Sequence, residues 1–177
     1  MSPSPFVVEW AARAARASPH GRALDLAMGR GRHAVALARA GFRTFGVDVK
    51  LEAMRDAMIA AAEHGVPIAC WCADLTSYPL PHARFELVVV SRYLQRDLFA
   101  AIRDTVAVGG TIIYETFTSE QRTLGTGPRS PEHLLEPGEL RRRFDGFDVL
   151  FYEETLTPEA LARIVARRVT ASEPRGT

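Results

Sequence analysis

The sequence predicts an α/β fold: a doubly wound, mostly parallel Rossmann-like sheet of about seven strands with helices on both faces. Two observations predict it. The stretch from Ala23 to Asp48 reads as an apolar strand, a Gly-x-Gly turn, an Ala-rich helix and a second apolar strand, which together form a βαβ unit. In addition, Phe85–Val90 is continuously apolar, as expected for a strand buried on both faces of a parallel sheet.

Length and composition indicate one globular domain, which we expect at residues 1–170, followed by a disordered tail at 171–177. The 177 residues are 47% apolar and 24% charged, and the net charge is +1. That charge gives no electrostatic reason to expect a nucleic-acid partner. No apolar run approaches the roughly 20 residues of a membrane helix, so we expect no membrane partner.

The N-terminal segment lacks the long apolar core of a signal peptide, because Arg13 and Arg16 interrupt it. The two cysteines, Cys70 and Cys72, lie too close together in one expected strand to staple the fold. Both observations predict a reduced, cytoplasmic protein. The sequence leaves open whether it is a monomer or a homodimer.

The first half of the chain alternates between helices and strands. Glycines end two of these helices, because Gly41 follows the first crossover helix and Gly65 follows the second. The expected elements are a helix at Phe6–Ala17, a strand at Ala23–Ala27, a helix at Arg32–Ala40, a strand at Phe42–Val47, a helix at Leu51–His64 and a strand at Val66–Cys72. This alternation predicts a parallel sheet.

The second half continues the alternation with longer connections. Two prolines predict a loop at Thr76–Arg84, and Thr118–Pro131 is a loop long enough to be functional. The remaining expected elements are strands at Phe85–Val90, Thr111–Phe117 and Phe147–Glu153, a helix at Leu94–Val106 that stops at Gly109 and Gly110, and a short helix at Glu136–Phe144. Residues 158–169 fit either a helix or a final strand.

Polar side chains fall at or near the carboxyl ends of five expected strands: Asp25, Asp48, Asp74, Ser91 and Glu115. In an open parallel sheet these ends share one edge, where ligands bind. Asp48 follows Gly29 by roughly 20 residues, the distance at which a carboxylate meets the ribose hydroxyls of a bound cofactor. The sequence therefore predicts a cofactor that contains adenosine.

The segments that carry these residues resemble the motifs of class I S-adenosylmethionine-dependent methyltransferases. They are ALDLAMGRGRHA, FGVDV, WCADLTSYPL and FELVVVSRYL, and GGTIIYETFT resembles the fifth strand of that family. Within the family, RHAVALARAGF, YETFT and GPRSPEHLLEPGEL resemble the small tellurite-resistance (TehB-like) branch. The resemblance covers nearly the whole chain and implies an enzyme that uses S-adenosyl-L-methionine.

The resemblance also implies which residues hold the cofactor. They are Asp25, Ala27, Gly29 and Gly31 around the methionine part, Asp48 at the ribose, Val49, Asp74 and Leu75 around the adenine, and Ser91 at the reactive end. Two positions depart from the pattern of the family. Ala27 stands where a glycine is usual, and its methyl group is compatible with a negative φ. Met28 stands where a small residue is expected.

The loop Gln121–Leu135 has two interpretations. It is either a solvated surface loop or a lid that closes over the substrate and excludes water. In the second case Arg122 and Arg129, together with Arg92 after the fourth strand of the sheet, offer positive charge to a small anionic substrate.

Four side chains are candidates for a direct part in catalysis: Arg92, Tyr93, Glu115 and His133. Tyr93 offers an aromatic face for a sulfonium. Glu115 and His133 are candidate general bases, which the reaction needs only if the acceptor loses a proton. The chemistry requires no metal.

We therefore predict methyl transfer to a small-molecule acceptor, which the TehB-like resemblance implies to be a tellurium or selenium oxyanion or a thiol. Two alternatives stay open. The segment from Gly29 to Ala34 also fits the G-x-G-x-x-A pattern of an NAD(P)-dependent oxidoreductase. A noncatalytic module that binds S-adenosylmethionine would need the same cofactor residues. Methylation of nucleic acid is disfavoured, because Ser91-Arg92-Tyr93-Leu94 replaces the Asn/Asp-Pro-Pro-aromatic motif.

Overall fold

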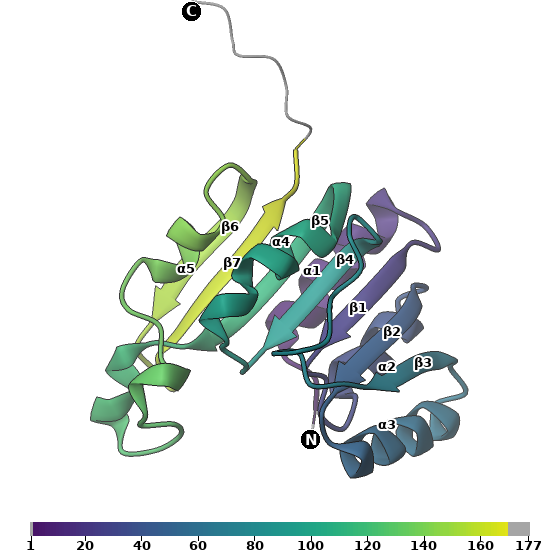
Figure 1. The fold of residues 1–177 in the computed structure, drawn as a ribbon, viewed down its shortest axis with the longest axis horizontal. Coiled ribbons are helices and arrows are strands. Elements are labelled where there is room, and N and C mark those ends of the chain that lie inside the picture. Colours follow the sequence, from purple (N-terminus) through teal and green to yellow (C-terminus); the bar gives the residue numbers. More distant parts are fainter. Residues whose placement is uncertain (1, 170–177) are drawn as a thin grey trace, which may run out of the picture.

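The computed structural model describes residues 2–169, so the tail expected at 171–177 lies outside the described residues. Seven strands form one sheet in the order β3-β2-β1-β4-β5-β7-β6 (Figure 1). Strands β1 to β5 pair in parallel, whereas β7 runs antiparallel to both β5 and β6. The predicted fold class, with a mostly parallel sheet, is confirmed.

Most of the expected elements are present with small shifts at their ends. The strands are β1 (Arg22–Leu26), β2 (Arg43–Asp48), β3 (Ile68–Cys72), β4 (Phe85–Ser91), β5 (Val106–Phe117), β6 (Asp148–Thr155) and β7 (Leu161–Arg167). The α-helices are α1 (Pro5–Ala17), α2 (Arg32–Arg39), α3 (Leu51–Glu63), α4 (Phe99–Thr105) and α5 (Glu139–Arg143). Short 3-10 helices are η1 (Arg96–Leu98), η2 (Ser119–Leu124) and η3 (Pro131–His133).

Residues 158–169, whose sequence fits either a helix or a strand, contain the strand β7. It lies between β5 and β6 and pairs with both. Ile164, Val165 and Ala166 are fully buried, as expected for three successive residues of an inner strand covered on both faces.

The prediction of a helix at Leu94–Val106 is wrong at both ends. The helix α4 starts later, after η1, and Val106 already belongs to β5. Gly109 and Gly110 therefore lie in a strand and do not stop a helix. The pairing of β5 with β4 is irregular there, and a Cβ on Gly110 would come within 3.0 Å of the Glu86 carbonyl oxygen. The strand thus needs a residue without a side chain at this point.

Helices cover the two faces of the sheet unequally. α1, α2 and α3 pack on one face, whereas α4 and α5 pack on the other, over β4, β5 and β7 (Figure 1). The connection from β3 to β4, residues 73–84, contains neither helix nor strand. It places Leu75 and Leu80 against the core cluster that includes side chains of β1 and β2. On that face, this connection takes the place of a helix between β3 and β4.

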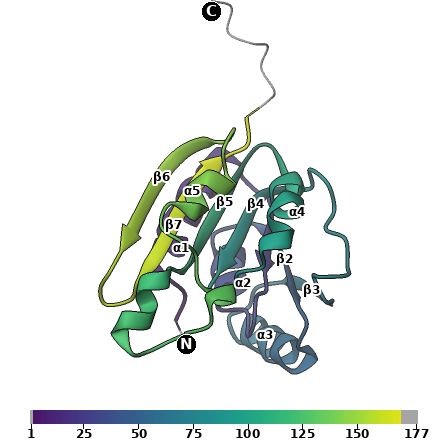
Figure 2. The ribbon, with the colours of Figure 1, turned by 60° about the vertical axis from the view of Figure 1, so that its left-hand side comes forward.

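A buried carboxylate at the start of α5 ties this helix to the segment after β4, and Arg96 extends the tie to the β5–α5 connection at the lower left of Figure 2. Glu139 accepts hydrogen bonds from Arg96 at 2.8 Å and from Arg143 at 3.0 Å, and Arg96 also donates to the Leu134 carbonyl at 2.9 Å. Burial alone raises the pKa of Glu139, but the bonds from Arg96, the Glu136 N–H and Arg143 outweigh it and lower the pKa to about 2.

We expect Glu139→Gln to reduce the free energy of unfolding by about 1–3 kcal/mol at pH 7, because it leaves two guanidinium groups without their counter-charge. The folded-state pKa is depressed, so the contribution of the carboxylate is present above its unfolded value of about 4.3 and is lost as the pH falls toward 2. Urea unfolding across this range measures both effects. The variant should lose less stability than the wild type on acidification, and equal losses would contradict the assignment.

Candidate functional site

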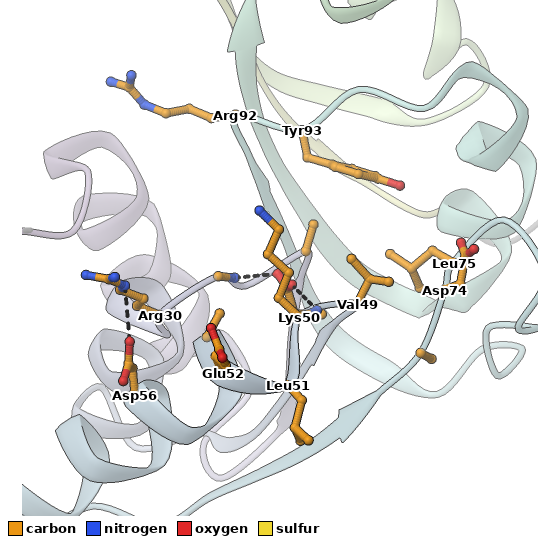
Figure 3. A pocket seen from close by; sticks show the side chains of 15 residues that line it. Arg30, Val49, Lys50, Leu51, Glu52, Asp56, Asp74, Leu75, Arg92 and Tyr93 are labelled. Atoms are coloured by element: carbon orange, nitrogen blue, oxygen red, sulfur yellow. Dashed lines mark hydrogen bonds and ion pairs between the residues drawn. The ribbon is translucent and has the colours of Figure 1, made fainter.

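The polar residues at the strand ends lie along one edge of the sheet. Asp48 and Ser91 end β2 and β4, Asp25 and Glu115 lie near the ends of β1 and β5, and Asp74 follows β3. A cavity of about 940 Å³, here called the cofactor cavity, opens between the connections that follow β1, β2, β3 and β4 (Figure 3). Its lining includes these candidate residues: Ala27, Gly29, Asp48, Val49, Asp74, Leu75, Arg92 and Tyr93.

The backbone of two connections fixes the carboxylate of Asp48. Its Oδ2 accepts a hydrogen bond from the Gly29 N–H at 2.8 Å, and its Oδ1 accepts one from the Lys50 N–H at 2.9 Å. A carboxylate has about four lone-pair positions, so two remain for other donors. Because both oxygens are held, the group keeps one orientation, which suits recognition of a ribose diol.

Apolar side chains and a second carboxylate line the cavity beyond Asp48. Val49 is 60% exposed and Leu51 is 51% exposed, so a ligand here would cover apolar surface. Asp74 accepts hydrogen bonds from the hydroxyl and the N–H of Thr76 at 2.7 and 2.9 Å, which lower its pKa. An ionised acceptor next to exposed apolar side chains fits a planar base that carries an amino group.

The turn after β1 packs tightly on α3. Gly31 has a φ of +74°, and a Cβ there would lie 2.6 Å from the Ala57 Cβ, so only glycine fits. Asp25 lies buried next to this turn and accepts a hydrogen bond from the Ala34 N–H at 2.8 Å. It thereby satisfies one of the unpaired donors of the first turn of α2. Burial raises the pKa of Asp25 to about 7. Asp25 and Gly31 support the turn without lining the cofactor cavity.

The structure accounts differently for the two departures from the family pattern. Ala27 has a φ of +55°, the left-handed conformation that disfavours a Cβ. The negative φ with which its methyl group would be compatible is therefore not observed. Met28 is accommodated by Gly46 on the neighbouring strand. A Cβ on Gly46 would overlap the Met28 sulfur, so the larger side chain occupies the space that glycine leaves.

Arg92 and Tyr93 line the cofactor cavity but point in different directions (Figure 3). The Arg92 guanidinium donates two hydrogen bonds to the Glu159 carboxylate, at 2.8 and 2.5 Å, and lies over the Phe117 ring. Its charge is therefore already paired. Burial raises the pKa of Tyr93, as do the nearby charges of Asp74 and Asp48, so its phenol stays neutral and offers an aromatic face.

Glu115 lies in a buried polar cluster and not in the wall of the cofactor cavity. Its two carboxylate oxygens each accept a hydrogen bond at 3.0 Å, one from the Ser4 hydroxyl and one from the Ser91 hydroxyl. Arg163 approaches the same carboxylate at 3.4 Å. The Ser4 N–H donates to His33 Nε2 at 3.1 Å. This cluster anchors the N-terminal segment at the sheet edge and leaves Glu115 little freedom to act as a base.

Sequence reasoning missed Arg32, the first residue of α2. It lines a second cavity of about 850 Å³ that adjoins the cofactor cavity at Gly29 and includes Ser91. Arg32 donates to the Ser2 carbonyl at 3.2 Å and to the Ser91 hydroxyl at 3.5 Å. Within residues 2–169 no carboxylate oxygen lies within 4.0 Å of its guanidinium. Burial and the charge of Arg92 lower its pKa. In the sequence, the position of Arg32 directly after the Gly-x-Gly turn is the feature that could have identified it as a site residue.

The loop with two interpretations does not bring its basic residues to either of these cavities. Arg122, Arg129 and His133 are exposed and line neither one. Both arginines donate to carbonyl groups of their own loop. Gln121 is buried and accepts a hydrogen bond from the Ala160 N–H at 2.8 Å. The loop is thus anchored to the β6–β7 turn in this conformation.

The cofactor cavity fits the adenosine part of S-adenosylmethionine in size and in chemistry. Its volume lies within the range of small-molecule sites, roughly 300–1,000 Å³, and a fixed carboxylate lies beside apolar side chains. Across the described part of the chain, no three His, Cys, Asp or Glu side chains converge as a metal site requires. No helix among residues 2–169 is long and apolar enough to cross a membrane.

Known proteins share this fold. Residues 23–110, just under half of the chain, match the family described as "Methyltransferase domain". The comparison with curated proteins gave no match. Among solved structures, TehB from Haemophilus influenzae has a TM-score of 0.74 at 17% identity, and the match covers 90% of this chain and 62% of TehB. This chain therefore spans less than two thirds of TehB.

Two other similar structures are S-adenosylmethionine-dependent methyltransferases. The protein from Mesorhizobium loti has a TM-score of 0.69 at 20% identity, with 91% of this chain and 98% of that chain covered. The protein from Clostridium acetobutylicum has a TM-score of 0.72 at 14% identity, with 93% and 90% covered. The oxidoreductase alternative is not favoured, because the usual dinucleotide-binding order is 3-2-1-4-5-6, whereas β7 here lies between β5 and β6.

We expect Ala27→Gly to raise the free energy of unfolding by about 1 kcal/mol. A left-handed residue with a Cβ costs roughly 1–2 kcal/mol, and the greater backbone entropy that glycine loses on folding offsets only part of that gain. Urea unfolding measures the change. Ala36→Gly, inside α2, is the matched control and should lower stability by about 1 kcal/mol. Destabilisation by both substitutions would show that Ala27 is not strained.

Proposed function

We propose that the protein is an S-adenosylmethionine-dependent methyltransferase that transfers a methyl group to a small soft or anionic acceptor, such as an oxyanion of tellurium or selenium, or a thiol. The matched domain and the shared fold support the enzyme class and imply the cofactor. The observation that carries the acceptor class is the charge of Arg32, which no carboxylate of the described chain neutralises at close range.

The residues proposed to hold the cofactor line the cofactor cavity. Asp48 would accept hydrogen bonds from the ribose hydroxyls with the lone pairs that Gly29 and Lys50 leave free. Val49 and Leu75 would contact the adenine, and Asp74 would accept a bond from its amino group. The proposal thus uses both the carboxylates and the exposed apolar side chains of the cavity.

Arg32 supports an anionic acceptor for two reasons. A partly buried guanidinium without a counter-ion is costly, and a bound anion would remove that cost. The guanidinium also presents several donors in a fixed plane, which match the oxygens of an oxyanion. The resemblance to the TehB-like branch points to the same class of substrate.

When bound, S-adenosylmethionine supplies an activated methyl group. The residues of the chain then have to position the acceptor and exclude water. Arg32, at the start of α2, would orient the acceptor, with the Ser91 hydroxyl accepting a hydrogen bond from its guanidinium and donating to Glu115. The face of Tyr93 would favour positive charge. An acceptor atom that has a lone pair without losing a proton needs no general base. An oxyanion that attacks through a lone pair therefore requires neither Glu115 nor His133 as a base, whereas a thiol first loses its proton to solvent and attacks as the thiolate.

We further propose that the protein acts on free small molecules in the cytoplasm, without nucleic acid, as a monomer or homodimer. The net charge of +1 supports the absence of a nucleic-acid partner. The free thiols of Cys70 and Cys72 are consistent with a reducing compartment.

We expect Asp48→Asn to weaken the binding of S-adenosylhomocysteine about 10- to 100-fold, because charge-assisted hydrogen bonds worth roughly 1.5–3 kcal/mol are lost. Calorimetric titration measures the affinity, and circular dichroism checks the fold. Asp148→Asn, an exposed carboxylate on β6, is the matched control and should bind normally. Unchanged affinity in Asp48→Asn would refute the ribose assignment.

We expect Arg32→Gln to lower kcat/KM for selenite or tellurite at least about tenfold, because the acceptor loses charge-assisted hydrogen bonds. The affinity for S-adenosylhomocysteine should change much less. Formation of S-adenosylhomocysteine reports turnover, and a neutral thiol serves as the comparison acceptor, whose turnover should be little affected. An equal loss for both acceptors, or wild-type turnover of the anion, would show that Arg32 does not recognise charge.

A further inference from the structure

A third cavity, here called the aromatic cavity, lies away from the cofactor residues. Its volume is about 440 Å³, within the range of small-ligand sites. Arg22, Arg43 and Phe85 line it and are the first residues of β1, β2 and β4. Because these strands are parallel, the aromatic cavity lies toward the edge of the sheet opposite the carboxyl ends that carry Asp48. Tyr78 to Pro81 of the β3–β4 connection form its other wall.

Aromatic side chains form the interior of this cavity. Phe45 and Trp71 come from β2 and β3, on the face that the connection 73–84 covers without a helix. Tyr78, on that connection, is 51% exposed. The Trp71 indole N–H is buried and has no hydrogen-bond partner. Among residues 2–169, every other buried side-chain nitrogen or oxygen atom has one. An unpaired buried donor costs about 1–3 kcal/mol.

The rim of the aromatic cavity is basic. Arg22 is paired with Glu86 at 2.9 Å. Arg43 and Arg84 are exposed, and within the described residues neither guanidinium has a carboxylate oxygen within 4.0 Å. Two free guanidinium groups therefore stand beside a mostly aromatic interior.

We infer that the aromatic cavity binds a small aromatic carboxylate. Ring faces such as those of Phe45, Trp71 and Tyr78 favour a planar aromatic ligand. Guanidinium groups pair with a carboxylate through charge-assisted hydrogen bonds, and among residues 2–169 those of Arg43 and Arg84 have no carboxylate partner. This ligand is distinct from the cofactor and from the proposed methyl acceptor, because the residues that bind it lie at a different part of the sheet.

The test is a calorimetric titration with 2-naphthoate in the presence of saturating S-adenosylhomocysteine, which occupies the adenine site. Fluorescence of Trp71 in a Trp10→Phe background reports the same binding, because the chain has 2 tryptophans. We expect saturable binding at one site, with a change in Trp71 emission. 2-Naphthalenemethanol, which has the ring without the charge, should bind at least about tenfold more weakly.

The double variant Arg43→Gln/Arg84→Gln should weaken 2-naphthoate binding at least about tenfold. Arg16→Gln/Arg55→Gln removes the same charge from two exposed helical positions and should leave the affinity unchanged. Circular dichroism confirms that both variants are folded. The inference is overturned if 2-naphthoate shows no saturable binding at millimolar concentration, if Trp71 emission does not respond, or if the two double variants bind equally well.

Discussion

The rest of the candidate cofactor site depends on the carboxylate of Asp48. It joins the turn after β1 to the connection after β2 through the N–H groups of Gly29 and Lys50. The two strands are already held in register, with Leu26 opposite Val47, so the carboxylate removes the freedom that remains in the two connections. A site fixed before its ligand arrives loses less entropy on binding. The sheet thus provides the spacing, and one side chain sets the final geometry.

Packing around the turn after β1 shows how neighbouring positions compensate for one another. Gly31 lets α2 approach Ala57 on α3, and Gly46 makes room for Met28. Neither pair is adjacent in sequence, so an unusual residue in the turn is accommodated by a small residue elsewhere. Ala27 has no such compensation, since its left-handed conformation is a property of its own backbone.

Local patterns predict the sheet and one wall of the site, whereas features that depend on distant partners escape them. Apolar periodicity and the Gly-x-Gly turn identify the strands and place Asp48 at a strand end. The end of α4 was missed because the irregular start of β5 depends on its pairing with β4. Arg32 was missed because only tertiary structure shows that a charge lacks a partner. Arg92 was expected to offer positive charge to the substrate, but its guanidinium is paired with Glu159. The sequence does not reveal this pair, because the two residues are far apart in the chain.

The unequal helix cover of the sheet has a consequence for how the molecule opens. Strands β1 to β3, with the connections that follow them, contain most of the proposed cofactor residues. The helices that contact these strands pack on one face only. Regions with less buried packing open at lower free energy than the rest of a protein. This half should therefore exchange its amide hydrogens faster than the half built on β4, β5 and β7. A ligand that binds only the closed form opposes that opening in proportion to its concentration. The amount of intact protein in a cell would then follow the supply of cofactor as well as the rate of synthesis.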